Sequence, residues 1–255
     1  MKTVLKTIVL CVVVVFALFL SIKIHNSTNA LTTENSRLEL APNDPTVQLL
    51  MNRVNSSDIF RSAGFSTSNL KEDDVIAYVF DNLTKDDYST KKVEHKKSLC
   101  EVTGKILFTS TSDCNVKIIS NDVFTSKIKN DFNVDFELSK KTFDYHGHFC
   151  KNDGKKYYCL LSKYTYMIKH FSVVKEAYEE DNKLVIKEYY FFVDLNDRDT
   201  CNLYLNVDYC EKKNVNEEVV VDEDIIKNNG VLYQHEFEHV DDNYYYLQSF
   251  VVSER

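Results

Sequence analysis

Glycine, proline and tryptophan are scarce in this chain of 255 residues, which holds five glycines, two prolines and no tryptophan. The two closest glycines, Gly147 and Gly154, stand seven residues apart, so the chain contains no G-x-G pair. Dinucleotide-binding fingerprints and glycine-rich phosphate loops both need closely spaced glycines. A G-x-S-x-G nucleophile elbow is also missing, because Gly64-Phe65-Ser66 continues as Thr67-Ser68. These absences exclude several large classes of nucleotide-dependent and hydrolytic enzymes.

Near the N-terminus lies an apolar run without charge, Ile8–Ile22, between Lys6 and Lys23. Such a run spans about 22 Å as a helix, short of the roughly 30 Å of a bilayer's hydrocarbon core. Extending it to residues 4–24 reaches a spanning length, with a lysine near each interface. Positive charge on the short N-terminal side places that side in the cytoplasm. The sequence therefore predicts a signal-anchor helix over residues 1–25, embedded in the membrane through residues 4–24.

A cleaved secretory signal is the alternative for the same segment. The run fits the apolar region of a signal peptide, and Thr28-Asn29-Ala30 offers a cleavage site near Ala30. Cys11 lies inside the run without small residues before it, which argues against a lipoprotein anchor. Both alternatives predict that the body of the protein lies outside the cytoplasm, either tethered to the cell membrane or secreted.

Beyond this segment the chain is acidic. Residues 31–255 carry 28 lysines and arginines against 39 aspartates and glutamates, a formal net charge of −11. A body of this charge repels phosphate backbones, so nucleic acid is not expected as a partner. With 44% hydrophobic and 27% charged residues, the chain has the composition of a folded globular protein.

Helical signals occupy the first half of the body. Residues 26–43 are polar and without periodicity, and they are interpreted as a tether. Asp44-Pro45 is typical of a helix N-cap followed by proline at the first helical position, and it opens a domain over 44–255. Further helices are predicted over about 71–84, behind an acidic first turn, and over 123–132.

Strand signals dominate the second half. The β-forming run Lys183–Asp194 is joined to Phe171–Tyr178 by a polar turn. Further pairs of strands are predicted around Asn152-Asp153-Gly154 and around 241–243, from the flanking segments 143–150 with 155–161 and 231–240 with 244–252. Helices early and strands late predict an α+β fold. We expect two or three helices packed on a curved antiparallel sheet, as in cystatin-like or NTF2-like proteins.

Six cysteines remain outside the apolar run, an even number that is typical of disulfides in an oxidising compartment. Six cysteines allow fifteen connectivities, but these fall into three local couples, and free thiols remain the alternative. Cys150 and Cys159 would face each other across a hairpin with the four-residue loop Asp153–Lys156. A zinc site is disfavoured because no C-x-x-C occurs. The candidates are Cys100, Cys114, Cys150, Cys159, Cys201 and Cys210.

The segment His235-Glu236-Phe237-Glu238-His239 matches H-E-x-x-H. On a helix, His235 and His239 could share a zinc ion while Glu236 activates its water, as in a surface zinc metallopeptidase. That hypothesis predicts a helix over 233–247. Apolar and polar residues instead alternate around the motif, and a charged residue, Glu238, precedes the second histidine. The pattern favours a half-buried strand whose other face is exposed. This interpretation expects no metal ligand, no catalytic residue and no cofactor.

Two further segments carry weaker signals. His146 and His148 lie on one face of a predicted strand within reach of Cys150, and they are interpreted as a surface hairpin. Asp194–Asp199 matches a calcium loop only at its first and third positions, because Arg198 takes the fifth position and the required glycine is missing. It is interpreted as an acidic turn.

The segments FDYHGHFCKNDGKKYYC and YQHEFEHVDDNYYYLQSF, behind an N-terminal apolar segment, resemble uncharacterised, N-terminally anchored extracytoplasmic proteins of AT-rich Gram-positive bacteria. The resemblance covers about half of the chain and brings no activity with it. We therefore expect a membrane-tethered, non-enzymatic binding or scaffolding module for an extracytoplasmic protein or a cell-envelope ligand. The zinc metallopeptidase is the alternative.

Overall fold

The computed structural model describes residues 37–253, except residues 63, 94, 97–98, 104–105, 110–113, 146, 162–167, 206–209 and 211–218. A compact unit, Glu39–Arg255, contains nearly all of this part. The predicted anchor over residues 1–25 and most of the predicted tether lie outside the described residues. Within the described part, no helix has the length and apolar character needed to cross a membrane.

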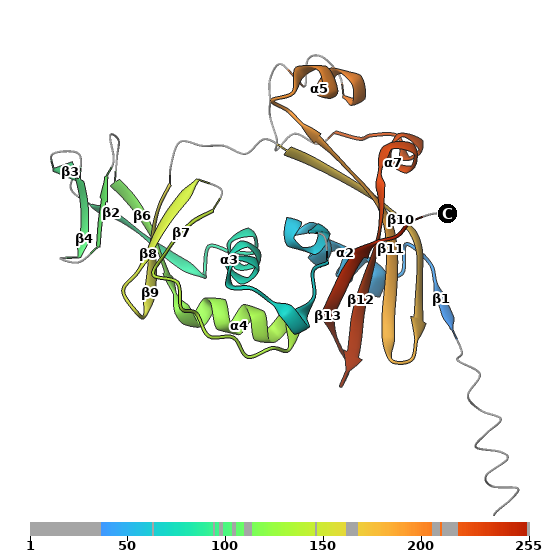
Figure 1. The fold of residues 1–255 in the computed structure, drawn as a ribbon, viewed down its shortest axis with the longest axis horizontal. Coiled ribbons are helices and arrows are strands. Elements are labelled where there is room, and N and C mark those ends of the chain that lie inside the picture. The colour runs from blue at the N-terminus through green and yellow to red at the C-terminus, as the bar shows by residue number, and fades with distance from the viewer. Residues whose placement is uncertain are drawn as a thin grey trace, which may run out of the picture. The chain divides into compact units, whose positions relative to one another are not determined.

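The described chain mixes short helices with antiparallel sheets, so the α+β prediction is confirmed (Figure 1). The α-helices are α2 (Pro45–Asn55), α3 (Glu72–Asp81), α4 (Asn121–Phe132), α5 (Arg198–Tyr204) and α7 (Glu223–Asn229), and the 3-10 turns are η1 (Asp58–Arg61) and η2 (Thr67–Asn69). The strands are β1 (Leu38–Leu40), β2 (Tyr88–Val93), β3 (His95–Lys96), β4 (Leu99–Thr103), β5 (Ile106–Thr109), β6 (Cys114–Ser120), β7 (Thr142–Tyr145), β8 (His148–Asn152), β9 (Lys156–Leu161), β10 (Ile168–Glu180), β11 (Lys183–Asp194), β12 (Val231–Val240) and β13 (Asn243–Val251).

These strands form three sheets, where a single curved sheet was expected. Sheet A has the order β1-β10-β11-β12-β13, sheet B the order β2-β6-β9-β8-β7, and sheet C the order β3-β4-β5. The chain builds sheet B from β-strands on both sides of α4, a pairing between distant segments that local sequence patterns do not show.

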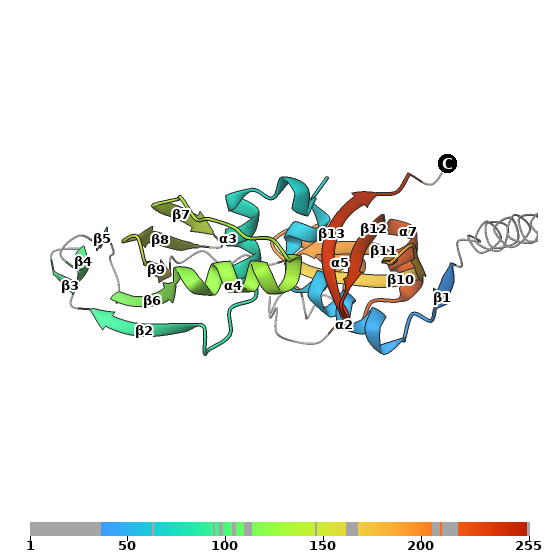
Figure 2. The same cartoon turned by 90° about the horizontal axis from the view of Figure 1, so that it is seen from below.

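The three predicted helices are present, and their ends follow local chemistry. The Asp44 side chain accepts a hydrogen bond from the Thr46 amide at 2.8 Å, so α2 begins with the predicted cap. In α4, Ser120 caps the start by accepting from Asp122, and Asn133 ends the helix in the left-handed conformation with φ 54°. Helix α4 contacts both β6 and β13 (Figure 2).

Two tight turns organise sheet A. Asp181 and Asn182 join β10 to β11, and Asp241 and Asp242 join β12 to β13, all with positive φ. Two consecutive residues with positive φ match the twist of a two-residue hairpin, and Asn and Asp tolerate that conformation. The bounds of β11 and β12 agree with the predicted segments, whereas the predicted strand 143–150 is divided into β7 and β8.

All three local cysteine couples form disulfides. They join Cys100 to Cys114, Cys150 to Cys159 and Cys201 to Cys210, with Cα–Cα distances of 5.6, 4.1 and 5.8 Å. Cys150 and Cys159 lie directly opposite each other in sheet B, and the register from Asn152 to Tyr157 leaves the predicted four-residue loop. Three disulfides are typical of a protein body that folds outside the cytoplasm.

The main hydrophobic core draws on α2, α3, α4 and strands of both large sheets. Its largest fully buried members are aromatic, and Phe60 alone contacts the rings of four neighbours. A second cluster lies on the other face of sheet A, where Val193 and Phe191 pack under the 201–210 disulfide and Ile226 of α7. Strands β10 and β11 of sheet A are therefore covered by apolar residues on both faces.

Candidate functional site

The H-E-x-x-H segment lies on strand β12, so the predicted strand is confirmed and the helix over 233–247 is not formed. Residues four apart on a strand are separated by about 13 Å, too far for two imidazoles on one zinc ion. His235 is 0% exposed, against the expectation of an exposed strand. Glu236 points to the opposite face, where it accepts hydrogen bonds from Gln234 and Gln248.

The weaker sequence candidates separate in the structure. The ring of His148 packs at a tilt against Phe80, Cys150 is bonded to Cys159, and His146 lies outside the described residues. The segment 194–199 forms a turn in which aspartate side chains accept hydrogen bonds from main-chain amides two residues on, at Asn196 and Asp199. The acidic-turn interpretation is confirmed. Among the described residues, no three or more His, Cys, Asp or Glu side chains gather to hold a metal ion.

The structure instead brings together a buried network of Arg61, Glu188, His235 and Tyr246, which we call the Glu188 network. One oxygen of Glu188 accepts from Arg61 Nε at 2.8 Å and from His235 Nε2 at 2.9 Å, and the other accepts from Arg61 Nη2 at 3.0 Å. His235 Nδ1 lies 2.9 Å from the Tyr246 hydroxyl. Arg61 is 8% exposed and Glu188 is 0% exposed, so an ion pair lies inside the core.

Hydrogen bonding assigns the protons in this network. A carboxylate only accepts, so His235 Nε2 carries the proton, and Nδ1 is left to accept from the Tyr246 hydroxyl. Burial lowers the pKa of His235, against the opposing effect of Glu188. Burial alone would raise the pKa of Glu188, but the His235 hydrogen bond and the Arg61 charge outweigh it and hold the pKa at about 2. At neutral pH the network thus holds one positive and one negative charge in direct contact, with the neutral His235 bonded to Glu188 and the neutral Tyr246 bonded to His235.

Sequence reasoning missed this network. Arg61 and Glu188 are 127 residues apart, and nothing local distinguishes Arg61 from a surface charge. The available signal was Glu188 itself, a charged residue among the inward-facing positions of a strong β-strand, next to Ile186.

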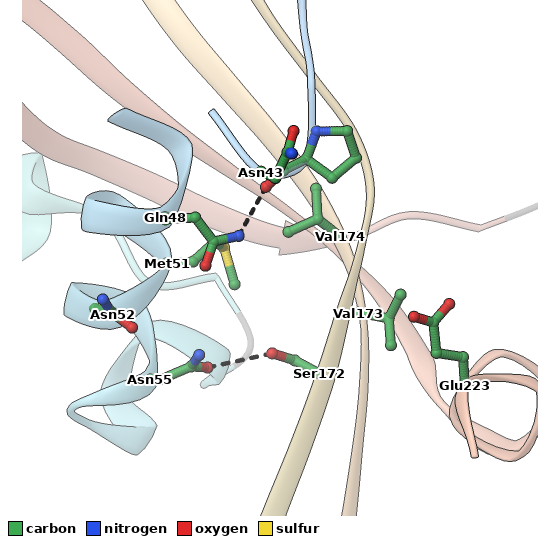
Figure 3. A pocket seen from close by; sticks show the side chains of 10 residues that line it. Asn43, Gln48, Met51, Asn52, Asn55, Ser172, Val173, Val174 and Glu223 are labelled. Atoms are coloured by element: carbon green, nitrogen blue, oxygen red, sulfur yellow. Dashed lines mark hydrogen bonds between the residues drawn. The ribbon is translucent and has the colours of Figure 1, made fainter. Parts of the chain in front are cut away.

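A pocket of about 410 Å³ lies between α2 and β10 (Figure 3). Its volume is within the range of about 300–1,000 Å³ that ligand sites occupy. We call it the α2–β10 pocket, and it is lined by Pro42, Asn43, Gln48, Met51, Asn52, Asn55, Ser172, Val173, Val174 and Glu223. Four of these side chains end in a neutral amide.

Several of the amide groups are available. Gln48 donates to the Pro42 carbonyl at 2.7 Å, which leaves its side-chain oxygen as an acceptor. In the described part of the chain, the side chains of Asn43 and Asn52 have no hydrogen-bond partner, nor has Nδ2 of Asn55. The pocket therefore presents both hydrogen-bond donors and hydrogen-bond acceptors. Glu223 is the only charged residue in its lining.

Asn55 connects the pocket to the Glu188 network. Its Oδ1 accepts from Arg61 Nη2 at 2.5 Å and from the Ser172 hydroxyl at 3.4 Å. Glu188 fixes the guanidinium of Arg61, which also lies 4.1 Å from the centroid of the Tyr190 ring. Because Arg61 and Ser172 hold its oxygen, the side chain of Asn55 is fixed in place and its amide nitrogen keeps both donors for a ligand.

The chemistry of this site suits binding. Glu223, the pocket's only acidic residue, accepts from Lys227 at 2.9 Å, and the pocket lining includes neither histidine nor cysteine. Such a lining offers no nucleophile with an adjacent base. Comparisons with known proteins add no assignment, since no family model, curated protein or solved structure matches the chain.

Proposed function

We propose that this chain is an extracytoplasmic binding module that takes its ligand in the α2–β10 pocket. The observation that carries the proposal is Asn55, a pocket amide held in place by a buried ion pair. The unpartnered amides of Asn43 and Asn52 support it, since they provide hydrogen-bonding groups at the pocket. The ligand is an extracytoplasmic protein or a component of the cell envelope.

The proposal includes the location of the module. The apolar run over residues 4–24 anchors the chain as a single span with a cytoplasmic N-terminus, and residues 26–43 act as a tether, with signal cleavage near Ala30 as the alternative. The resemblance to anchored proteins of Gram-positive bacteria agrees with this location. The helices beside the twisted sheet A support a distant relation in form to cystatin-like or NTF2-like folds.

Fractionation of producing cells tests the location. We expect the full-length chain in the membrane fraction, with its body digested by protease added to intact protoplasts. Intact full-length chain in the cytosol, or a body protected from the protease, would contradict the proposal.

Photo-crosslinking in intact cells tests the pocket. A benzoylphenylalanine at the exposed position Asn52 is expected to form a covalent adduct with the bound ligand. The matched control places the same group at Leu49, which is 61% exposed on the same helix but outside the pocket lining. Equal adducts at both positions, or none at position 52, would contradict a ligand site in this pocket.

The zinc metallopeptidase is disfavoured because His235 is engaged by Glu188 and Tyr246 on a strand. Elemental analysis of the purified chain checks this conclusion. One zinc ion per chain, lost on His235→Gln substitution, would restore the enzyme hypothesis and overturn the binding module.

A further inference from the structure

The α2–β10 pocket borders the edge of a β-strand. Neighbouring residues of a strand point to opposite faces of the sheet. Val174 packs against the main core, and Val173 packs against the cluster on the other face of sheet A. A cavity lined by both side chains, with α2 on one side and Glu223 of α7 on the other, must reach around the edge of β10 (Figure 3).

Among the described strands, only a short one pairs with that edge. Strand β10 has thirteen residues, and the strand next to it on this side, β1, has three. The register of β10 with β11 shifts between Val174 and Glu176, which marks a bulge at the end of the pocket. Strand edges present unpaired main-chain donors and acceptors, and bulges are common where such an edge adjoins a binding site.

The wall opposite the strand edge carries groups that match a peptide backbone. A side-chain amide has one acceptor and two donors, so it can pair with both the N–H and the C=O of a peptide unit. Gln48, Asn52 and Asn55 lie along one side of α2 facing β10. Met51, Val173 and Val174 add apolar surface that suits the alternate side chains of an extended segment.

The charge of the protein indicates which kind of polypeptide segment could bind in the pocket. Glu223 stands at the pocket, and the body beyond residue 30 carries a formal net charge of −11. An acidic segment would be repelled, whereas a neutral or basic one would not.

We propose that the ligand of the α2–β10 pocket is an extended, neutral or basic polypeptide segment that adds as a strand to the edge of β10 at Ser172, Val173 and Val174, while the amides of α2 pair with its main chain. This inference rests on the proposed function and specifies its ligand. Recognition of this kind depends on main-chain hydrogen bonds more than on side-chain identity.

The test uses the full-length chain in detergent micelles and a capped heptapeptide of alternating threonine and valine with one terminal lysine. We expect the amide resonances of Ser172, Val173 and Val174 to shift on titration. A peptide of the same sequence with N-methyl groups on alternate residues is expected to bind at least about tenfold more weakly, the order of factor that one lost main-chain hydrogen bond produces. Equal affinity of the two peptides would overturn strand addition.

Variants locate the binding. Asn52→Trp is expected to abolish the shifts by filling the pocket, whereas Leu49→Trp on the exposed side of the same helix leaves them unchanged. Shifts that survive Asn52→Trp would overturn the proposal.

A chitooligosaccharide serves as a probe of the other ligand class. If it shifts the pocket amides and the heptapeptide does not, the peptide inference is wrong while the proposed binding function stands. If neither probe shifts them, the inference is also wrong, and the photo-crosslink at position 52 decides the proposed function independently.

Discussion

Sheets A and B of this protein both have five strands, but they differ in strand length and in what holds them together. The four major strands of sheet A have nine to thirteen residues, whereas the strands of sheet B have four to seven. Sheet B carries the disulfide between Cys150 and Cys159 across two neighbouring strands. Sheet A has no disulfide between its strands and buries the ion pair of Arg61 and Glu188.

The difference shows two ways to stabilise a small sheet. Short strands form few main-chain hydrogen bonds and bury little surface, so a covalent link that limits the unfolded chain has a large relative effect. Long strands with apolar cover on both faces tolerate a buried charge pair, provided every polar atom in it is bonded. In sheet A that pair also orients Asn55 at the pocket.

The largest effect is expected from breaking the ion pair of sheet A. Glu188→Ala leaves the guanidinium of Arg61 buried without its counter-charge, and such changes cost about 3–5 kcal/mol. Urea unfolding of the purified chain measures this loss. Glu238→Gln on the exposed side of β12 is the control and is expected to change the free energy of unfolding by less than about 0.5 kcal/mol.

A double variant sharpens the result. Replacing both partners, Arg61→Met with Glu188→Leu, removes the charges together and is expected to be less destabilising than Glu188→Ala alone. A double variant as unstable as the single one would show that the site matters through packing and not through charge.

The next effect concerns the disulfide of sheet B. Cys150→Ala with Cys159→Ala opens a loop with a sequence separation of nine, for which chain entropy gives about 2–3 kcal/mol. Cys201→Ala with Cys210→Ala opens a loop of equal separation and serves as the matched comparison. Equal losses in thermal unfolding would mean that loop closure explains both, and a larger loss for 150 and 159 would indicate that short strands depend on their link.

The third effect is a dependence on pH that belongs to sheet A. Burial lowers the pKa of His235, so below about pH 6.5 the unfolded chain binds a proton at this residue that the folded chain does not. Stability is therefore complete above pH 6.5 and falls by up to about 1.4 kcal/mol per pH unit below it. Glu188, with its pKa held at about 2, adds a separate loss below about pH 4.5.

His235→Gln tests this assignment. Glutamine can donate to Glu188 and accept from Tyr246 without titrating, so denaturation curves between pH 7 and 5 should lose the slope due to His235. An unchanged slope would place the titrating group elsewhere.

The smallest effect compares two helix caps. Asp44→Ala removes the cap of α2 beside the pocket, and Ser120→Ala removes the cap where β6 of sheet B leads into α4. Each is expected to cost about 1 kcal/mol in thermal unfolding. Asp44→Ala should reduce the free energy of unfolding slightly more than Ser120→Ala, because the charge of Asp44 also interacts with the helix dipole. A loss below about 0.3 kcal/mol at either position would show that tertiary contacts hold that helix end.

Local patterns predicted much of this fold. The cap at Asp44, the bounds of β11, the turn at 241–242 and the hairpin between Cys150 and Cys159 all follow from residues within a few positions of one another. The strand at His235 was also predicted, from alternation around the motif. Its burial was not predicted, because the local sequence does not show whether a carboxylate from another strand lies where it can accept a hydrogen bond from the histidine.

The sequence by itself determined the α+β class, the acidic body and the absence of glycine-rich nucleotide sites, since each depends on composition or on short separations along the chain. It also indicated local cysteine couples, with free thiols as the alternative, and the structure shows all three couples bonded. Only the tertiary structure decided the division into separate sheets, the burial of Arg61 with Glu188 and the α2–β10 pocket. The ion pair and the pocket join segments more than a hundred residues apart. The free energy of all these features arises from desolvation and packing that exist only once the chain has folded.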